Sequence, residues 1–202
     1  MRRWVLRLLQ SCGVDIASKV ISLAAVLSFV GMAILPAYAP ARWELPLSIA
    51  SNVVVDTAGN IYCGSQAYSQ IQKYSADGRF LRRWDVGGGG PRTLRITDRG
   101  RIVAFELRGR YVDVFTLGGE LVRKVAAAEW ANPTYYQPDV MRNRYEMRGS
   151  IFLPGHVVRV DAEGHQTDVI RAHVWWFFFQ APFPAFLYGL LAVVPDLINR
   201  YL

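Results

Sequence analysis

The residue types best suited to chemistry are sparse in this chain. It contains three histidines, His156, His165 and His173, and two cysteines, Cys12 and Cys63. None of them falls in an HExxH, CxxCH or paired CxxC arrangement, the spacings that bind zinc or attach haem. We therefore expect no metal site and no cofactor. An apolar segment separates the two cysteines, so we expect them not to pair, and Cys63 to be a small buried residue.

Most of the remaining candidates for chemistry are carboxylates that lie beside glycines. Asp56, Asp77, Asp98 and Asp161 occur in short stretches such as DTAGN and DAEG. Such stretches are typical of tight turns, so we interpret these aspartates as turn residues and not as a catalytic acid pair. The run Gly87–Gly90 lacks the Gly-Lys-Ser/Thr ending of a phosphate loop and predicts a linker. We expect no catalytic residue and no enzyme activity.

The elements that would position these residues repeat along the chain. Residues 53–84 and 94–125 align at a constant offset of 41, which matches Gly59 with Gly100 and Gly78 with Gly119. A third, degenerate copy is expected at 149–170. Each copy holds short alternating or β-rich runs, such as IYC, QIQKYS and FLRRW, between turn residues. Because alternation with a period of two is typical of strands, each full copy predicts about four short antiparallel strands, the size of one propeller blade.

The first copy, VVVDTAGNIYCGSQAYSQIQKYSADGRFLRRW, resembles the NHL repeat, which builds β-propeller blades. Asp56, Gly59, Asn60, Asp77 and Gly78 match the turn positions of that family. The resemblance implies a mostly β fold of partial, propeller-like antiparallel blades. NHL propellers usually have about six blades. Three copies therefore predict an open stack whose strand edges a partner covers, or a ring that closes only by oligomerisation.

Two uncharged apolar segments flank the repeats, at residues 20–41 and 174–195. Each is long enough for a helix to cross the hydrocarbon layer of a membrane. Pro182 and Pro184 interrupt the second segment, so a re-entrant path is an alternative there. A cleaved signal peptide is the alternative for the first, because Ala37-Tyr38-Ala39 resembles a cleavage site. The long preceding stretch and the following Pro40 favour an uncleaved anchor.

Positive charge sets the expected orientation. Basic residues outnumber acidic ones before the first apolar segment, which places the N-terminus in the cytoplasm. Two spans then return the C-terminus to the cytoplasm and leave 42–173 outside a bacterial inner membrane, in the periplasm. The predicted organisation is an anchor at 1–41, a β domain at 42–173 and a second membrane segment with a short tail at 174–202. The expected membrane-interface residues are Arg2, Arg3, Trp4, Arg7, Trp175 and Trp176.

The stretch 126–148 does not fit the repeat and is predicted to be an insertion. It is rich in tyrosine, tryptophan and arginine, the residue types enriched at the centres of protein interfaces. A surface loop that packs its own aromatic side chains is the alternative. The candidate docking residues are Trp130, Tyr135, Tyr136, Arg142, Arg144 and Tyr145.

Composition narrows the class of function. Charged residues make up only 19% of the 202 positions, and the net charge of +7 forms no dense basic stripe, so nucleic acid is not an expected partner. The pattern predicts a non-catalytic, membrane-anchored accessory or scaffolding subunit. Its partners would be the lipid bilayer and the subunits of a larger membrane complex, respiratory or photosynthetic for example. A membrane-anchored ligand-binding or sensor module and an enzyme on a propeller fragment are the alternatives, and homo-oligomerisation is an open option.

Overall fold

The structure is a computed structural model that describes residues 40–45, 47, 50–66, 68–130, 143–149 and 155–171, with Lys19, Leu23 and Val26. The chain divides into two units, Met1–Tyr38 with Phe177–Leu202, and Ala39–Trp176. The expected membrane segments lie almost wholly outside the described residues. No helix among the described residues has the length and hydropathy of a membrane span.

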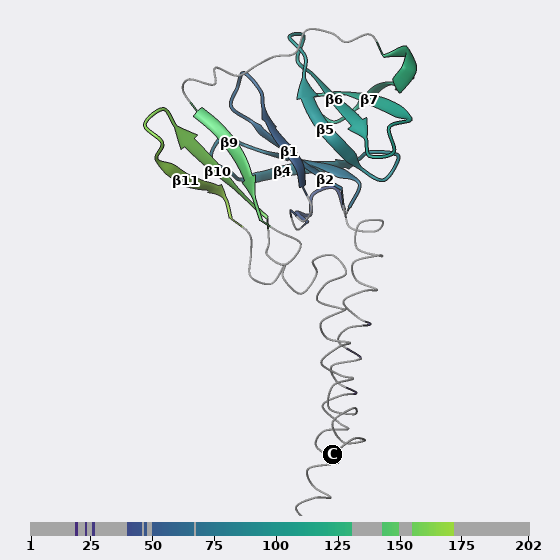
Figure 1. Ribbon diagram of the computed structural model, residues 1–202. Helices are drawn as coiled ribbons and strands as arrows, with labels where there is room; N and C mark the ends of the chain where they lie inside the picture. The colour runs from purple at the N-terminus through teal and green to yellow at the C-terminus, as the bar shows by residue number, and fades with distance from the viewer. Residues whose placement is uncertain are drawn as a thin grey trace, which may run out of the picture. The chain divides into compact units, whose positions relative to one another are not determined.

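The described part of the second unit is mostly β and contains three antiparallel sheets (Figure 1). The first sheet runs in chain order through β1 (Ala50–Val55), β2 (Ile61–Ser65), β3 (Gln70–Tyr74) and β4 (Phe80–Asp85). The second does the same through β5 (Pro91–Ile96), β6 (Arg101–Glu106), β7 (Tyr111–Thr116) and β8 (Leu121–Ala126). The four-stranded unit predicted for the first two copies is confirmed.

The third sheet has the strand order β11-β10-β9 and begins earlier than the sequence predicts. Its strands are β9 (Asn143–Arg148), β10 (His156–Asp161) and β11 (Gln166–Ile170). The third copy was expected at 149–170, yet β9 lies within the predicted insertion 126–148. The insertion is therefore shorter than predicted, and a short 3-10 helix, η1 (Ala127–Glu129), follows β8 directly.

One turn recurs in all three sheets. Five hairpin turns begin with an oxygen-bearing side chain, at Asp56, Ser75, Thr97, Thr116 and Asp161. In each turn that side-chain oxygen accepts the backbone N–H of the residue four positions on, at 2.7 to 3.2 Å. The fourth residue is always a glycine with φ between +65° and +90°, where a Cβ would be strained. The aspartates predicted as turn residues therefore lie in turns, but in three of the five turns the oxygen that accepts the backbone N–H belongs to a serine or a threonine.

The first sheet lies between the other two (Figure 1). Tyr62 and Ile71 face a core shared with Leu94, Ile102 and other residues of the second sheet. Alternate residues of β2, including Cys63, face a second core shared with the third sheet, and every residue of β2 is buried. In space the sheets therefore follow the order third, first, second. The sequence predicts the strands, but it does not predict this order.

A polar clamp joins the first two sheets at β1 and β5. The side-chain amide of Asn52 donates to the Leu94 carbonyl at 2.8 Å and accepts the Leu94 N–H at 2.7 Å. It therefore imitates a strand partner for one residue of β5. Lys73 adds a second polar link, since its ammonium group donates to the Leu117 carbonyl of the second sheet at 3.2 Å. Within the first sheet, the Tyr62 hydroxyl donates to Asp56 at 2.8 Å from a fully buried ring. Desolvation, aided by the hydrogen bond to Asp56, raises the pKa of Tyr62 well above its ordinary value.

Residues 40–45, which we call the strap, lie along the border of the first sheet. Gln72 donates to the Leu45 carbonyl and accepts the Leu45 N–H, both at 2.9 Å. The N–H of Arg83 in β4 donates to the Ala41 carbonyl at 3.0 Å. The strap, which turns at 40–43, thus supplies one backbone acceptor to the outer edge of β4. Leu47 then enters the core between the first and third sheets.

Candidate docking surface

The structure distributes the candidate docking residues over two sheets. Trp130 follows η1 next to the second sheet, and Arg144 and Tyr145 belong to β9 of the third. Because these two sheets pack on opposite faces of the first, the described candidates form no single continuous loop surface. Tyr135, Tyr136 and Arg142 lie outside the described residues, as do the expected membrane-interface residues Arg2, Arg3, Trp4, Arg7, Trp175 and Trp176.

Trp130 packs onto the second sheet. Its ring meets that of Phe105 edge-on, with centroids 6.3 Å apart, and the Arg123 guanidinium lies 5.2 Å from its ring centroid. Trp130 remains partly exposed, and Arg123 is exposed. Aromatic and arginine side chains in such an arrangement are common at protein interfaces. Trp130 and Arg123 therefore mark one half of a candidate surface, and sequence analysis identified only the tryptophan.

Arg144 and Tyr145 have different roles on β9. Tyr145 packs against the core between the first and third sheets, so most of its contact is internal. Arg144 points to the outer side, where it pairs with Glu146. Glu146 also accepts a hydrogen bond from Arg148, and that bond, with both arginine charges, lowers the pKa of the Glu146 carboxyl. The outer side of the third sheet is thus a charged ladder whose members pair with one another.

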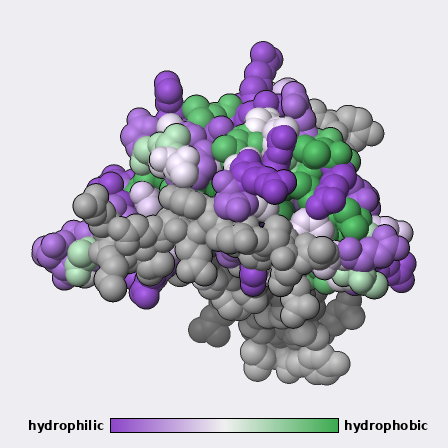
Figure 2. All heavy atoms as spheres, turned by 90° about the horizontal axis from the view of Figure 1, so that it is seen from above, coloured by the Kyte–Doolittle hydropathy of each residue, from purple (hydrophilic) through white to green (hydrophobic). Residues whose placement is uncertain are grey.

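Among the described residues, no strand pairs with β8, the outer strand of the second sheet, on the side away from β7, which we call its uncovered edge. Leu121 and Val122 are 57% and 49% exposed, although both are large and apolar. Figure 2 shows such apolar side chains (green) at the surface among hydrophilic ones (purple). An uncovered edge with exposed apolar side chains is a site where another strand can pair.

Equivalent hydrogen bonds lie at the ends of β8 and β4. After β8, the N–H of Ala127 donates to the Arg110 carbonyl at 3.0 Å. After β4, 41 residues earlier, the N–H of Val86 donates to the Ser69 carbonyl at 2.7 Å. Hydrogen-bonding direction alternates along a strand, so Lys124 and Ala126 direct their N–H groups away from β7. Lys124 is the repeat equivalent of Arg83, whose N–H binds the strap. Among the described residues, nothing takes the place of the strap beside β8.

Two buried carboxylates lie under the glycine run that connects β4 to β5. Glu106 and Asp113 are 2% and 3% exposed, and both pair with the ammonium group of Lys124. The hydrogen bond to Glu106 raises the pKa of Lys124, helped by Asp113 and opposed by desolvation. A Cβ on Gly88 would lie 2.0 Å from a Glu106 carboxylate oxygen, so any other residue there would have to displace the buried Glu106 side chain. Asp113 also accepts the Gly87 N–H at 3.3 Å, so the cluster contacts the linker directly.

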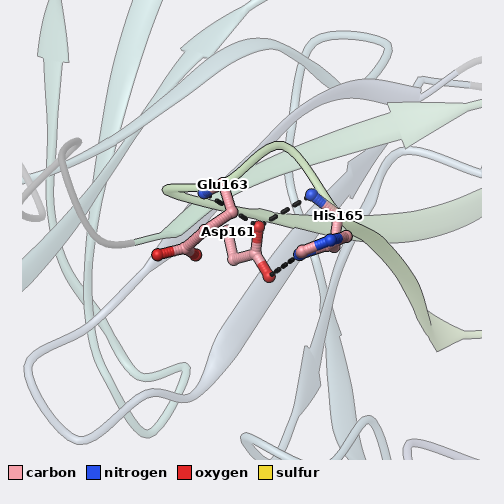
Figure 3. A group of neighbouring side chains, drawn as sticks. All are labelled: Asp161, Glu163 and His165. Carbon is pink, nitrogen blue, oxygen red and sulfur yellow. Dashed lines mark hydrogen bonds and ion pairs between the residues drawn. The ribbon is translucent and has the colours of Figure 1, made fainter.

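A second cluster, Asp161, Glu163 and His165, has the donor types of a metal site (Figure 3). It lies in the turn between β10 and β11. Asp161 accepts the N–H groups of Glu163 at 3.1 Å and His165 at 2.7 Å, and its other oxygen lies 3.2 Å from His165 Nδ1. Desolvation acts to raise the pKa of Asp161, but the hydrogen bonds from His165 outweigh it and the net shift is downward.

The turn itself accounts for this cluster. The same main-chain geometry recurs in four other turns, where the first residue is aspartate, serine or threonine. Glu163 and His165 are exposed, and the Asp161 carboxylate is already taken up by the turn. The cysteine that the structure describes, Cys63, is buried as predicted, and its burial raises the pKa of its thiol. His173 and Cys12 lie outside the described residues.

Comparison with other proteins assigns this chain to no family. The sequence matches no protein family and no curated protein. Among solved structures, a protein of unknown function from Bacteroides caccae is similar, with 17% identity and a TM-score of 0.35. The similarity covers 58% of this chain and 50% of that protein. The chain thus matches about half the length of that protein.

Proposed function

We propose that this protein is a non-catalytic accessory subunit whose β domain docks on a larger membrane complex. The observation that carries the proposal is the uncovered edge of β8, which exposes Leu121 and Val122 beside Trp130 and Arg123. A strand edge of this kind favours pairing with another chain. The apolar segments 20–41 and 174–195 supply the membrane anchor, and positive charge at the N-terminus places the β domain outside the cytoplasm.

The polar groups of the β domain support a binding role over catalysis. Glu106 and Asp113 share the single ammonium group of Lys124, Asp113 also accepts the Gly87 N–H, and Asp161 accepts backbone N–H groups of its own turn. These carboxylates are therefore committed to structure. A docking domain needs only a rigid scaffold and a free surface, and the two cores on either side of the first sheet supply that rigidity.

We also propose that the three sheets are blades of an NHL-like propeller that is open between the second and third. The support is the common turn and the 41-residue spacing of equivalent turns, from Asp56 to Thr97 and from Ser75 to Thr116. The polar outer side of the third sheet then caps one end of the stack, because its charges pair with one another. The second sheet, with β8, is the end that remains for a partner.

The test is the composition of the particle that contains this chain in native membranes. The tagged full-length chain is purified in a mild detergent and passed through two separations of different principle. A second protein at a constant ratio to this chain in both separations is the expected result. A chain that migrates by itself, or only with copies of itself, refutes the docking proposal.

A further inference from the structure

The strap shows what kind of segment fits the border of these sheets. On the first sheet a turn, closed by the bond from the Trp43 N–H to the Pro40 carbonyl, lies beside β4 and accepts the Arg83 N–H through the Ala41 carbonyl. The strap then binds Gln72 of the neighbouring strand through both backbone groups of Leu45. The second sheet has the same strand order and the same strand-end bonds. The N–H groups that β8 directs outward therefore have equivalents that bind a backbone carbonyl in the first sheet, and a strand edge offers such groups to an extended backbone.

The exposed side chains of β8 define the chemistry of that segment. Its first four residues are Leu121, Val122, Arg123 and Lys124, and all four are exposed. Lys124 is neutralised by Glu106 and Asp113, whereas in the described part of the chain no carboxylate pairs with Arg123. A complementary segment therefore supplies apolar side chains and one carboxylate. A second copy of β8 fits less well, because the strand holds two cations and no acid.

We infer that β8 binds an extended segment of a partner protein by strand addition, with a partner carboxylate facing Arg123. This inference rests on the proposed docking function and names the element that performs it. The partner strand accepts the outward N–H groups of Lys124 and Ala126, as the strap accepts that of Arg83. Its apolar side chains cover Leu121 and Val122.

Ala126 offers a specific test of the backbone contact. Its φ is −61°, close to the fixed value of proline, so Ala126→Pro removes the outward N–H without opposing the local backbone. Ala126→Val is the matched control, because valine has a similar size and keeps the N–H. We expect Ala126→Pro to weaken retention in the purified complex about tenfold and Ala126→Val to leave it unchanged.

Substitutions of Arg123 test the proposed contact with a carboxylate of the partner. Arg123→Glu places like charges face to face and is expected to release the partner, whereas Arg123→Lys keeps the charge and retains it. Arg108→Glu is the control, since Arg108 is an exposed arginine in the turn between β6 and β7. The third readout uses the unaltered protein. Amide hydrogen exchange at Lys124 and Ala126 should slow at least about tenfold in the complex relative to the free chain.

The outcomes separate this inference from the proposed function. A stable complex that survives Ala126→Pro and Arg123→Glu, with unchanged exchange in β8, overturns strand addition and leaves docking intact. Slowed exchange in a particle that contains only this chain identifies a second copy as the occupant and overturns the inference. A wild-type chain that migrates alone overturns both. If Ala126→Pro fails to fold, the Arg123→Glu variant and the exchange rates of the wild-type protein still test strand addition at β8.

Discussion

Replacing Gln72 with leucine removes both hydrogen bonds that hold the strap against the first sheet. The Gln72 side chain is fully buried and is bonded to the N–H and the carbonyl of Leu45, which is itself 4% exposed. Leucine has nearly the same volume and no polar atom. The substitution therefore tests the polar contact with little change in packing.

The expected cost follows from the number of groups left without partners. Each buried backbone group that loses its hydrogen bond costs about 1 to 3 kcal/mol. Two such groups give a loss of about 2 to 6 kcal/mol if the strap stays in place. Detachment of the strap lets water reach both groups but exposes Leu45 and Leu47, at about 1.5 to 3 kcal/mol each, so we expect a loss of about 2 to 6 kcal/mol in either case.

The free energy of unfolding is measured by urea titration of the full-length chain in mild detergent. Gln166→Leu is the control, because Gln166 is an exposed glutamine on β11 whose side chain accepts a surface hydrogen bond from Arg148. That variant should change stability by less than about 0.5 kcal/mol. Amide exchange at Leu45 should rise in Gln72→Leu alone. A Gln72→Leu protein with wild-type stability and a protected Leu45 amide would refute the role of the strap.

Three further results are expected. Gly78→Ala should destabilise the protein by at least about 2 kcal/mol more than Gly164→Ala in urea unfolding. Both glycines have φ above +80°, but only at Gly78 would a Cβ meet another atom closely, 1.9 Å from the Val169 carbonyl oxygen. Equal losses would show that Val169 moves aside. Cys63 should resist maleimide at pH 8 in the folded protein and react on unfolding, because burial raises the pKa of its thiol. Rapid labelling of the folded protein would contradict this burial. The lowered pKa of Asp161 means that its contribution to stability is present above pH 4 and is lost as pH falls further, so Asp161→Asn should flatten this part of the profile. An unchanged acid limb in that variant would show that the turn does not depend on the charge.

Local features of the fold were predictable because they depend on nearby residues. Strands such as Ile61–Ser65 follow from short runs rich in β-forming residues, and the turns follow from glycines with an oxygen-bearing side chain three positions earlier. The strand Asn143–Arg148 was missed because charged residues dominate it and only Tyr145 and Met147 mark its inner side. These two residues lie 42 positions after Val103 and Phe105, and extending the repeat to that spacing would have found them.

Features that depend on distant contacts were not predictable. The spatial order of the sheets depends on which face of the first sheet packs against the second sheet and which against the third. The residues of β2 predict that both faces are apolar, but they do not predict which sheet packs on which face. The same holds for the candidate site. Trp130 was identified by residue type, but Arg123 and the β8 edge become candidates only when the strand is found at the border of its sheet.

The most direct test of the docking function is the native mass of the particle that contains this chain. The particle is released from membranes in mild detergent and weighed by native mass spectrometry. We predict a mass that requires at least one protein other than this chain, at a fixed ratio. A mass equal to one copy, or to a whole number of copies of this chain with lipid and detergent, would contradict it.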